Sequence, residues 1–94
     1  MKVQNPVIGG VAQSVAGRDK GRLYLIVGAE GEKLLLADGK YRQVSNPKVK
    51  NKKHVRLLPV FHAEIAERIG LGKDENSEIR AALKRQLFEA DCAL

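Results

Sequence analysis

Short apolar runs separated by turn-forming residues fill the first sixty residues, a pattern that is typical of a small β domain. Five strands are predicted, at residues 10–16, 22–27, 32–37, 40–44 and 48–57. The second strand is the strongest, because Leu23 and Leu25 alternate with Tyr24 and Ile26. Since both of its faces are apolar, we expect it to be buried on both sides.

Two further segments carry specific signals. The pair Asp38-Gly39 is typical of a two-residue hairpin turn with positive φ at both positions, and residues 40–44 would then form the return strand. Residues 28–31 also predict a turn. Positions 48, 50, 52, 54 and 56 are Lys, Lys, Lys, His and Arg. If residues 48–57 are extended, one face of that strand is wholly basic.

After Pro59 the hydrophobic period changes to that of helices. The apolar positions are Phe61, Ile65 and Ile69 in a first short helix, and Ile79, Leu83 and Leu87 in a second. Gly70 and Gly72 would end the first helix, and Asn76 or Ser77 would cap the second. The second apolar stripe either packs on the rest of the protein or stays free to dock a partner.

These patterns predict a mainly β protein with C-terminal helices. Its 94 residues suit one domain. We expect an irregular N-terminal lead-in at residues 1–9 and a small five-stranded barrel at residues 10–58. Residues 59–94 would form a helical extension with one short and one longer α-helix.

The net charge of +6 is unevenly distributed along the chain. Residues 1–60 contain twelve Lys/Arg against four Asp/Glu, or +8, and residues 61–94 contain five against seven, or −2. This asymmetry indicates a polyanion-binding module followed by a neutral-to-acidic extension. Net charge also keeps soluble proteins from aggregating, so charge alone leaves both interpretations open.

A loop between Gly17 and Gly21 concentrates this charge. It places three cations beside the two glycines: Arg18, Lys20 and Arg22. A tight turn fixes such cations at low entropic cost, and an arginine can grip a phosphate through two N–H donors. Asp19 could shape the turn by accepting hydrogen bonds from backbone amides. The alternative is a solvated hairpin tip with ordinary surface charge.

Patterns for catalysis or metal binding are scarce. His54 and His62 have only Glu64 near them, and the single cysteine, Cys92, has no partner. We therefore expect no enzyme, no metal, no cofactor and no small-molecule substrate. The chain has no apolar run long enough for a membrane span and no secretory signal, so a cytoplasmic protein is expected.

The segment from Gly10 to Arg22 resembles a KOW motif, with Gly21 at the position of the signature glycine. The similarity covers most of residues 10–87 and points to the small bacterial KOW-domain RNA-binding proteins, which are similar to KOW-bearing large-subunit ribosomal proteins. The other matching segments are 37–40, Arg42, Val44, 47–48, Lys50, 53–54, 78–80 and 82–83.

The resemblance implies an SH3-like barrel, RNA or ribonucleoprotein binding, and no catalysis. The expected partner is ribosomal or other structured RNA. The residues predicted to bind it are Arg18, Lys20, Gly21, Arg22, Lys40, Arg42, Lys48, Lys50, Lys52, Lys53, His54 and Arg56. An adaptor for ribosomal or transcription proteins, using the barrel or the C-terminal helix, is the alternative. DNA also offers phosphates, and some lysines could instead protect a strand edge from aggregation.

Aromatic residues are few. Tyr41 is expected to be exposed, whereas Tyr24, Phe61 and Phe88 are expected to pack in the core. With so little material for stacking, we expect recognition to rest on phosphates and RNA shape rather than on unstacked bases.

Overall fold

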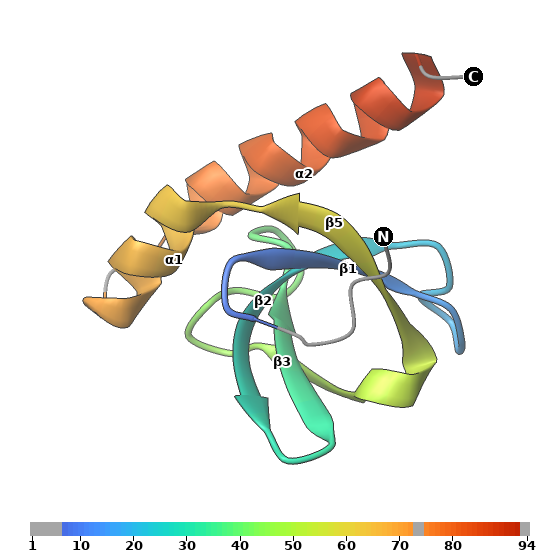
Figure 1. Cartoon of the computed structure of the whole chain (residues 1–94), viewed down its shortest axis with the longest axis horizontal. Helices are drawn as coiled ribbons and strands as arrows, with labels where there is room; N and C mark the ends of the chain where they lie inside the picture. The colour runs from blue at the N-terminus through green and yellow to red at the C-terminus, as the bar shows by residue number, and fades with distance from the viewer. Residues whose placement is uncertain (1–6, 73–74, 93–94) are drawn as a thin grey trace.

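The computed structural model describes residues 7–72 and 75–92, with side chains in the second helix as far as Arg85. Over these residues the chain forms five strands, one 3₁₀ turn and two helices (Figure 1). Their order is β1 (Gly10–Ser14), β2 (Leu23–Glu30), β3 (Lys33–Ala37), β4 (Lys48–Asn51), η1 (Lys52–His54), β5 (Val55–Phe61), α1 (Ala63–Gly70) and α2 (Asn76–Cys92). Most of the predicted lead-in, residues 1–6, lies outside the described part.

The strands form one antiparallel sheet in the order β4-β3-β2-β1-β5. The protein is therefore mainly β, with helices after the sheet, as the hydrophobic pattern predicted. The register of the sheet shifts between Gly10 and Val11, and again between Ile26 and Gly28. Such bulges bend strands, and Figure 1 shows the sheet curving strongly.

The second strand is longer than predicted. β2 continues to Glu30 because Gly28 and Ala29 still pair with β3, so the predicted turn at residues 28–31 is wrong. Gly28 serves close packing instead, since a Cβ there would come within 2.8 Å of the Leu35 side chain. The chain reverses at Gly31, whose φ is +60°.

The predicted return strand at residues 40–44 does not form. Asp38 Oδ1 accepts hydrogen bonds from the backbone amides of Lys40, Tyr41 and Arg42, at 2.9, 2.9 and 2.8 Å. These bonds wind the chain into a loop, because the amides that would start a strand ladder are taken. Every positive φ among the described residues belongs to a glycine, so Asp38 lacks the conformation of a type I′ turn.

The predicted basic strand at residues 48–57 is divided into two. β4 ends at Asn51, whose Oδ1 accepts a hydrogen bond from the Lys53 amide at 3.0 Å and caps the 3₁₀ turn η1. The prediction of one continuous basic face along residues 48–57 is therefore wrong. β5 then continues to Phe61, so residue 58 lies inside a strand. Phe61 belongs to the sheet and is 56% exposed, and it is not part of the first helix.

Both helices cover one face of the sheet (Figure 1). Leu25, which is fully buried, shares a cluster with Ile65 of α1 and with Ile79 and Leu83 of α2. The apolar stripe predicted on the second helix is therefore core over its described residues. Leu87, the third member of the stripe, lies outside the described side chains.

The other face of the sheet has its own core. Ala12, Tyr24, Ile26, Leu34 and Leu36 are all buried there in a second cluster. β2 contributes to both clusters, which confirms the prediction that it is buried on both sides. Of the aromatic predictions, the burial of Tyr24 and the exposure of Tyr41 are confirmed, that for Phe61 is wrong, and Phe88 lies outside the described side chains.

Candidate functional site

The loop that joins β1 to β2 is a tight turn framed by glycines, as predicted. Gly17 and Gly21 have φ of +84° and +93°, a region that glycine enters without strain. The Gly21 amide donates to the Ser14 carbonyl at 2.8 Å, and the Arg22 amide donates to the Asp19 carbonyl at 2.9 Å. The turn is thus held by its own backbone at both ends.

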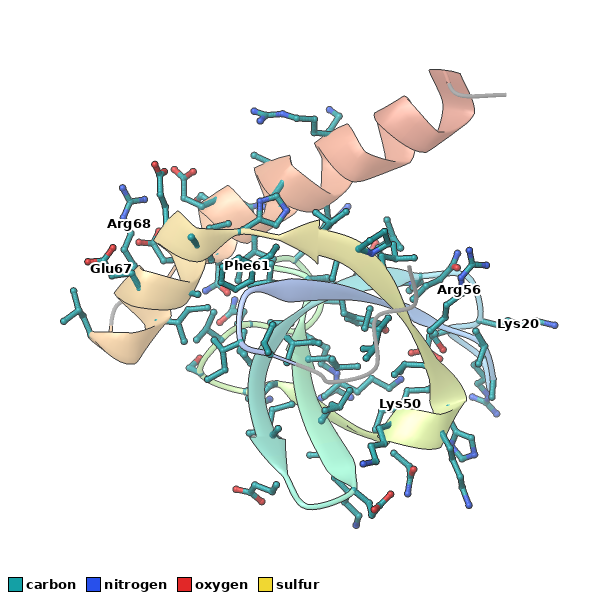
Figure 2. The ribbon with its side chains drawn as sticks, viewed as in Figure 1. Lys20, Lys50, Arg56, Phe61, Glu67 and Arg68 are labelled. Atoms are coloured by element: carbon teal, nitrogen blue, oxygen red, sulfur yellow. The ribbon has the colours of Figure 1, made fainter. Side chains whose placement is uncertain are left out.

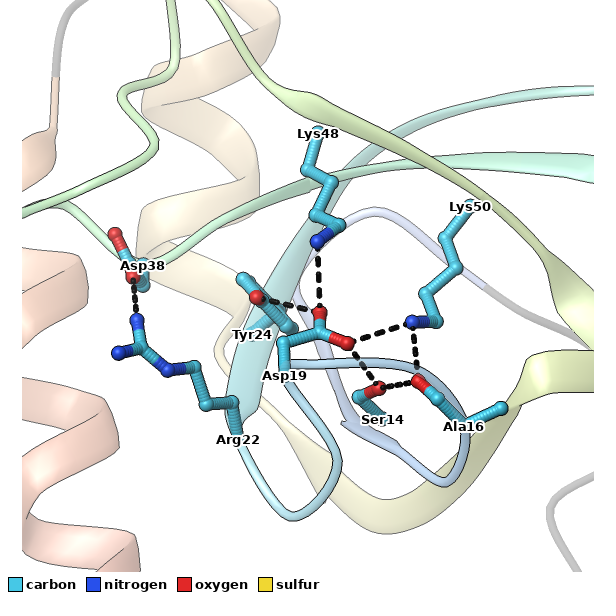
Figure 3. A network of polar contacts seen from close by, with 8 residues as sticks. All are labelled: Ser14, Ala16, Asp19, Arg22, Tyr24, Asp38, Lys48 and Lys50. Atoms are coloured by element: carbon cyan, nitrogen blue, oxygen red, sulfur yellow. Dashed lines mark hydrogen bonds and ion pairs between the residues drawn. The ribbon is translucent and has the colours of Figure 1, made fainter.

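A buried carboxylate anchors this turn to the neighbouring strands (Figure 3). Asp19 accepts hydrogen bonds from Ser14 Oγ and Tyr24 OH, each at 2.8 Å. Its two oxygens also lie 2.7 Å from Lys50 Nζ and 3.1 Å from Lys48 Nζ. The Asp19 side chain therefore shapes the turn by binding β1, β2 and β4, and not through backbone amides of the turn as the sequence had suggested.

The titration of this cluster follows from its partners. Burial by itself would raise the pKa of Asp19, but the hydrogen bonds from Lys50, Ser14, Tyr24 and Lys48 outweigh burial and hold that pKa well below its usual range. Burial and the neighbouring Asp19 carboxylate together raise the pKa of the Tyr24 phenol well above its usual value. At neutral pH the cluster is therefore a stable carboxylate with a neutral phenol beside it.

Two lysines predicted to bind RNA point into this cluster (Figure 3). The Lys50 side chain is only 10% exposed, and its ammonium also donates to the Ala16 carbonyl at 2.8 Å. Lys48 is 30% exposed and pairs with the same Asp19. Their charges are largely satisfied inside the protein, so they stabilise the turn.

The rest of the lysine tract lies on the surface. Lys52, Lys53 and His54 form the exposed turn η1, where Lys52 Nζ lies 3.7 Å from Glu32. Arg56 is exposed on β5, in register with Gln13 of β1.

The Gln13 side chain donates to the Gly21 carbonyl at 3.4 Å, so Arg56 lies beside the turn that holds the exposed Arg18. Figure 2 shows Arg56 and Lys20 on the same side of the molecule.

The loop after β3 is docked on the start of α2. Asn76 Oδ1 accepts a hydrogen bond from the Val44 amide at 2.9 Å, and Arg80 donates to the Gly39 carbonyl at 3.3 Å. Gly39 has φ of +80°, and a Cβ there would collide with the backbone of Asn76. This close approach fixes the loop against the helix.

Between the turn, the docked loop and α2 lies an open pocket of about 670 Å³, which we call the Tyr41 pocket. Its polar lining consists of Lys20, Arg22, Lys40, Arg80, Lys84 and the single acid Asp38. Gly21, Leu23, Tyr41 and Leu83 complete it. All five cationic residues are exposed, so basic side chains from three separate segments line one cavity.

Tyr41 forms the aromatic rim of this pocket and is 64% exposed. The Arg22 guanidinium lies 4.7 Å from the centre of its ring, and Lys40 Nζ lies 5.1 Å from it. Both distances are those of cation–π contacts. Arg22 also lies 3.9 Å from Asp38 Oδ2, which holds its guanidinium beside the ring (Figure 3).

Four of the twelve predicted residues therefore meet in the Tyr41 pocket: Lys20, Gly21, Arg22 and Lys40. Arg42 lies on the docked loop with its side chain exposed and does not line the pocket. Sequence reasoning missed Arg80 and Lys84, because the C-terminal segment carried a slight negative balance. Their spacing of four residues, flanking the core position Leu83, was the available signal.

A second pocket, of about 430 Å³, lies between the end of β5 and the two helices. Its charges are mixed, with Glu64 and Glu78 facing Arg68 and Arg85. His62 also lines it, and its Nε2 atom is buried without a hydrogen-bond partner. Because its positive and negative charges balance, this second pocket is less suited to a polyanion than the Tyr41 pocket is.

No protein-family model matches the chain, and no curated protein matches it either. Neither helix, over the residues described, is long and apolar enough to cross a membrane. Within the same residues, no group of three or more His, Cys, Asp or Glu side chains is arranged to hold a metal ion.

Proposed function

We propose that the protein is a non-catalytic, cytoplasmic RNA-binding protein that holds structured RNA against the Tyr41 pocket and the neighbouring basic turn. The observation that carries this proposal is the convergence of five exposed cations on one cavity with a single acid, Asp38, among them. A phosphate backbone is the common cellular ligand that presents evenly spaced negative charge to such a surface.

We further propose that the curved sheet is an SH3-like barrel of the KOW type. Two features support this architecture. The two edge strands of the sheet, β4 and β5, are joined directly by the three-residue turn η1, so the sheet must curl until its edges meet at that corner. The glycine-framed turn that resembles the KOW motif lies between β1 and β2, at the rim of the site.

The turn is organised before any ligand arrives. Its backbone is held by hydrogen bonds, and Asp19 ties it to β4 through Lys48 and Lys50. Cations displayed on such a rigid turn lose little conformational entropy when they bind phosphates, which favours affinity. We therefore assign Lys48 and Lys50 to organising the site, and the pocket cations together with Arg18 and Arg56 to contacting RNA.

The alternative of a protein-binding adaptor used either the barrel or a free apolar stripe along the second helix as the docking surface. Ile79 and Leu83 of that stripe are buried, at 0% and 6% exposure. RNA binding is therefore the function that the described surface supports best.

The test is fluorescence anisotropy of a labelled ribosomal RNA hairpin across a salt series. About five phosphate contacts give a slope of log affinity against log salt of roughly −3.5 to −4.5. The variant Lys20→Ala/Lys40→Ala should reduce the slope by roughly two. The matched control is Lys33→Ala/Arg85→Ala, which removes two exposed cations outside the Tyr41 pocket and should leave the slope within error of wild type.

Binding that does not change with salt, or equal losses in the two double variants, would contradict the proposed site. Unlabelled double-stranded DNA serves as competitor. If it displaces the hairpin as well as unlabelled RNA does, the ligand class widens from RNA to nucleic acid in general.

A further inference from the structure

The floor of the Tyr41 pocket is apolar, although its rim is basic. Leu23 of β2 and Leu83 of α2 line it, with 9% and 6% of their surfaces exposed, and the Tyr41 ring stands beside them. Contacts to phosphates alone need only exposed cations on a smooth surface. Phosphate contacts do not require an apolar floor with an aromatic wall. These two features offer a place for a flat, partly apolar group.

The size of the pocket fits one such group. Its volume of about 670 Å³ lies within the range of roughly 300–1,000 Å³ that is usual for sites of small organic ligands. The cations around it divide into those on the turn and loop, Lys20 and Lys40, and those on α2, Arg80 and Lys84. A chain that enters between these two sets would have phosphates on both sides of whatever group occupies the floor.

We propose that the Tyr41 pocket holds one unpaired nucleotide of the bound RNA, with its base against Tyr41 and its flanking phosphates on the two sets of cations. This inference rests on the proposed function and names its substrate class: structured RNA that carries a bulged or loop nucleotide. Proteins read unpaired bases by stacking them on exposed aromatic rings within a positive groove. Recognition by phosphates and RNA shape alone, as the sparse aromatic content predicted, would leave the pocket empty.

The surroundings of Tyr41 prepare it for this role. With 64% of its surface exposed, the ring remains open to solvent although Arg22 and Lys40 lie near it. The Arg22 guanidinium is held by Asp38, so it can keep the ring in place, whereas Lys40 is exposed and free to turn toward a phosphate. The incoming base would take the ring surface that Lys40 leaves.

The test uses two RNA hairpins of identical stem sequence, one uninterrupted and one with a single bulged 2-aminopurine nucleotide. Wild type should bind the bulged hairpin roughly fivefold or more tightly, the effect expected from one base–aromatic stack. The fluorescence of 2-aminopurine should fall on binding, because stacking quenches it. Tyr41→Phe should keep both effects, since it keeps the ring.

Tyr41→Leu should lose the preference and the quenching, whereas its binding of the uninterrupted hairpin should stay salt-dependent, because the pocket cations remain. Equal affinity of wild type for the two hairpins, or a preference that survives in Tyr41→Leu, would overturn the inference while leaving RNA binding intact. If neither hairpin binds in a salt-dependent way, the proposed function itself fails.

Adenosine 5′-monophosphate is the final control. Displacement of the bulged hairpin by the free nucleotide at concentrations comparable to those of the RNA would make the pocket a mononucleotide site. That result would also overturn the inference.

Discussion

At the scale of single residues, Asp19 connects the surface turn to the interior. Its carboxylate joins Ser14 and Tyr24 to Lys48 and Lys50, and its side chain is only 9% exposed. A buried carboxylate with four donors is strongly stabilised in its charged form. If the carboxylate were removed, two ammonium groups would lie close together with no counter-charge.

We therefore expect Asp19→Asn to lower the free energy of unfolding by roughly 3 kcal/mol, the loss typical of breaking a buried ion pair. The measurement is urea unfolding followed by circular dichroism at neutral pH. The control is Glu32→Gln, since Glu32 is 72% exposed and pairs with Lys52 at 3.7 Å. That change should cost less than about 0.5 kcal/mol. Similar losses in both variants would mean that the Asp19 cluster contributes no more than a surface pair.

The same residue predicts a pH dependence. Because the pKa of Asp19 in the folded state is held below its usual range, the unfolded chain binds this proton first as pH falls below about 4. The stabilisation from Asp19 is thus complete above that pH and is lost progressively in acid.

Unfolding of wild type and Asp19→Asn between pH 6 and pH 2.5 tests this dependence. The difference between their unfolding free energies should shrink as pH falls. A constant difference over the whole range would show that the carboxylate is not stabilised in its charged form.

The conformation or exposure of a residue was predictable from the sequence where the local backbone alone determines it. The positive φ of Gly17 and Gly21 followed from a tight turn, and the exposure of Tyr41 followed from its place after a turn. The burial of Lys50 and its ion pair with Asp19 were not predictable from the sequence. Its partner Asp19 is 31 residues away in the sequence, and the folded sheet brings β4 to the turn between β1 and β2. An alternating basic pattern cannot show which lysines find an internal partner.

At the scale of elements, the contact between the Gly39 loop and α2 joins the sheet to the last helix. We expect Gly39→Ala to be strongly destabilising, because its Cβ would collide with the Asn76 backbone and its φ is positive.

The control is Gly31→Ala, which has a φ of +60° but open space around the added Cβ, and it should cost only about 1 kcal/mol. Thermal unfolding of both variants is the measurement. Equal shifts in Tm would show that the cost is conformational only, and that the close approach to α2 is unimportant.

Elements with strong periodicity were predictable, and those decided by side-chain hydrogen bonds were not. The pattern predicted β1, β3 and both helices to within a few residues. The return strand at residues 40–44 failed because one carboxylate, Asp38, captures three amides. The strand at residues 48–57 failed because Asn51 caps a 3₁₀ turn in its middle. Both interruptions depend on side chains that a hydrophobic pattern does not register.

At the scale of the whole molecule, the candidate site draws on segments about sixty residues apart. Lys20 and Arg22 come from the first turn, whereas Arg80 and Lys84 come from α2. The net charges of the two parts of the sequence concealed this shared site, because the helices belong to the part with the slightly negative balance and were predicted to be a neutral-to-acidic extension. The fold brings Arg80 and Lys84 of α2 beside the basic turn, whereas Glu78 of the same helix lines the second pocket.

A ligand in the Tyr41 pocket should therefore protect both segments together. We expect RNA binding to slow amide hydrogen exchange severalfold at residues 17–23 and 76–84, because the bound form opens less often. Mass spectrometry of the free and hairpin-bound protein is the measurement. Peptides covering the hairpin tip at Gly31 are the internal control and should not change. Protection confined to one of the two segments would contradict a site shared between them.

The placement of α2 at the pocket also determines when, during synthesis of the chain, the proposed binding site becomes complete. The ribosome makes the basic turn before α2, because the helix that carries Arg80 and Lys84 follows the complete sheet in the sequence. A nascent chain would thus display half of the proposed binding surface until α2 emerges and packs on the sheet. The dependence of the pocket on α2 would delay tight capture of the proposed RNA ligand until α2 has been made and has packed on the sheet.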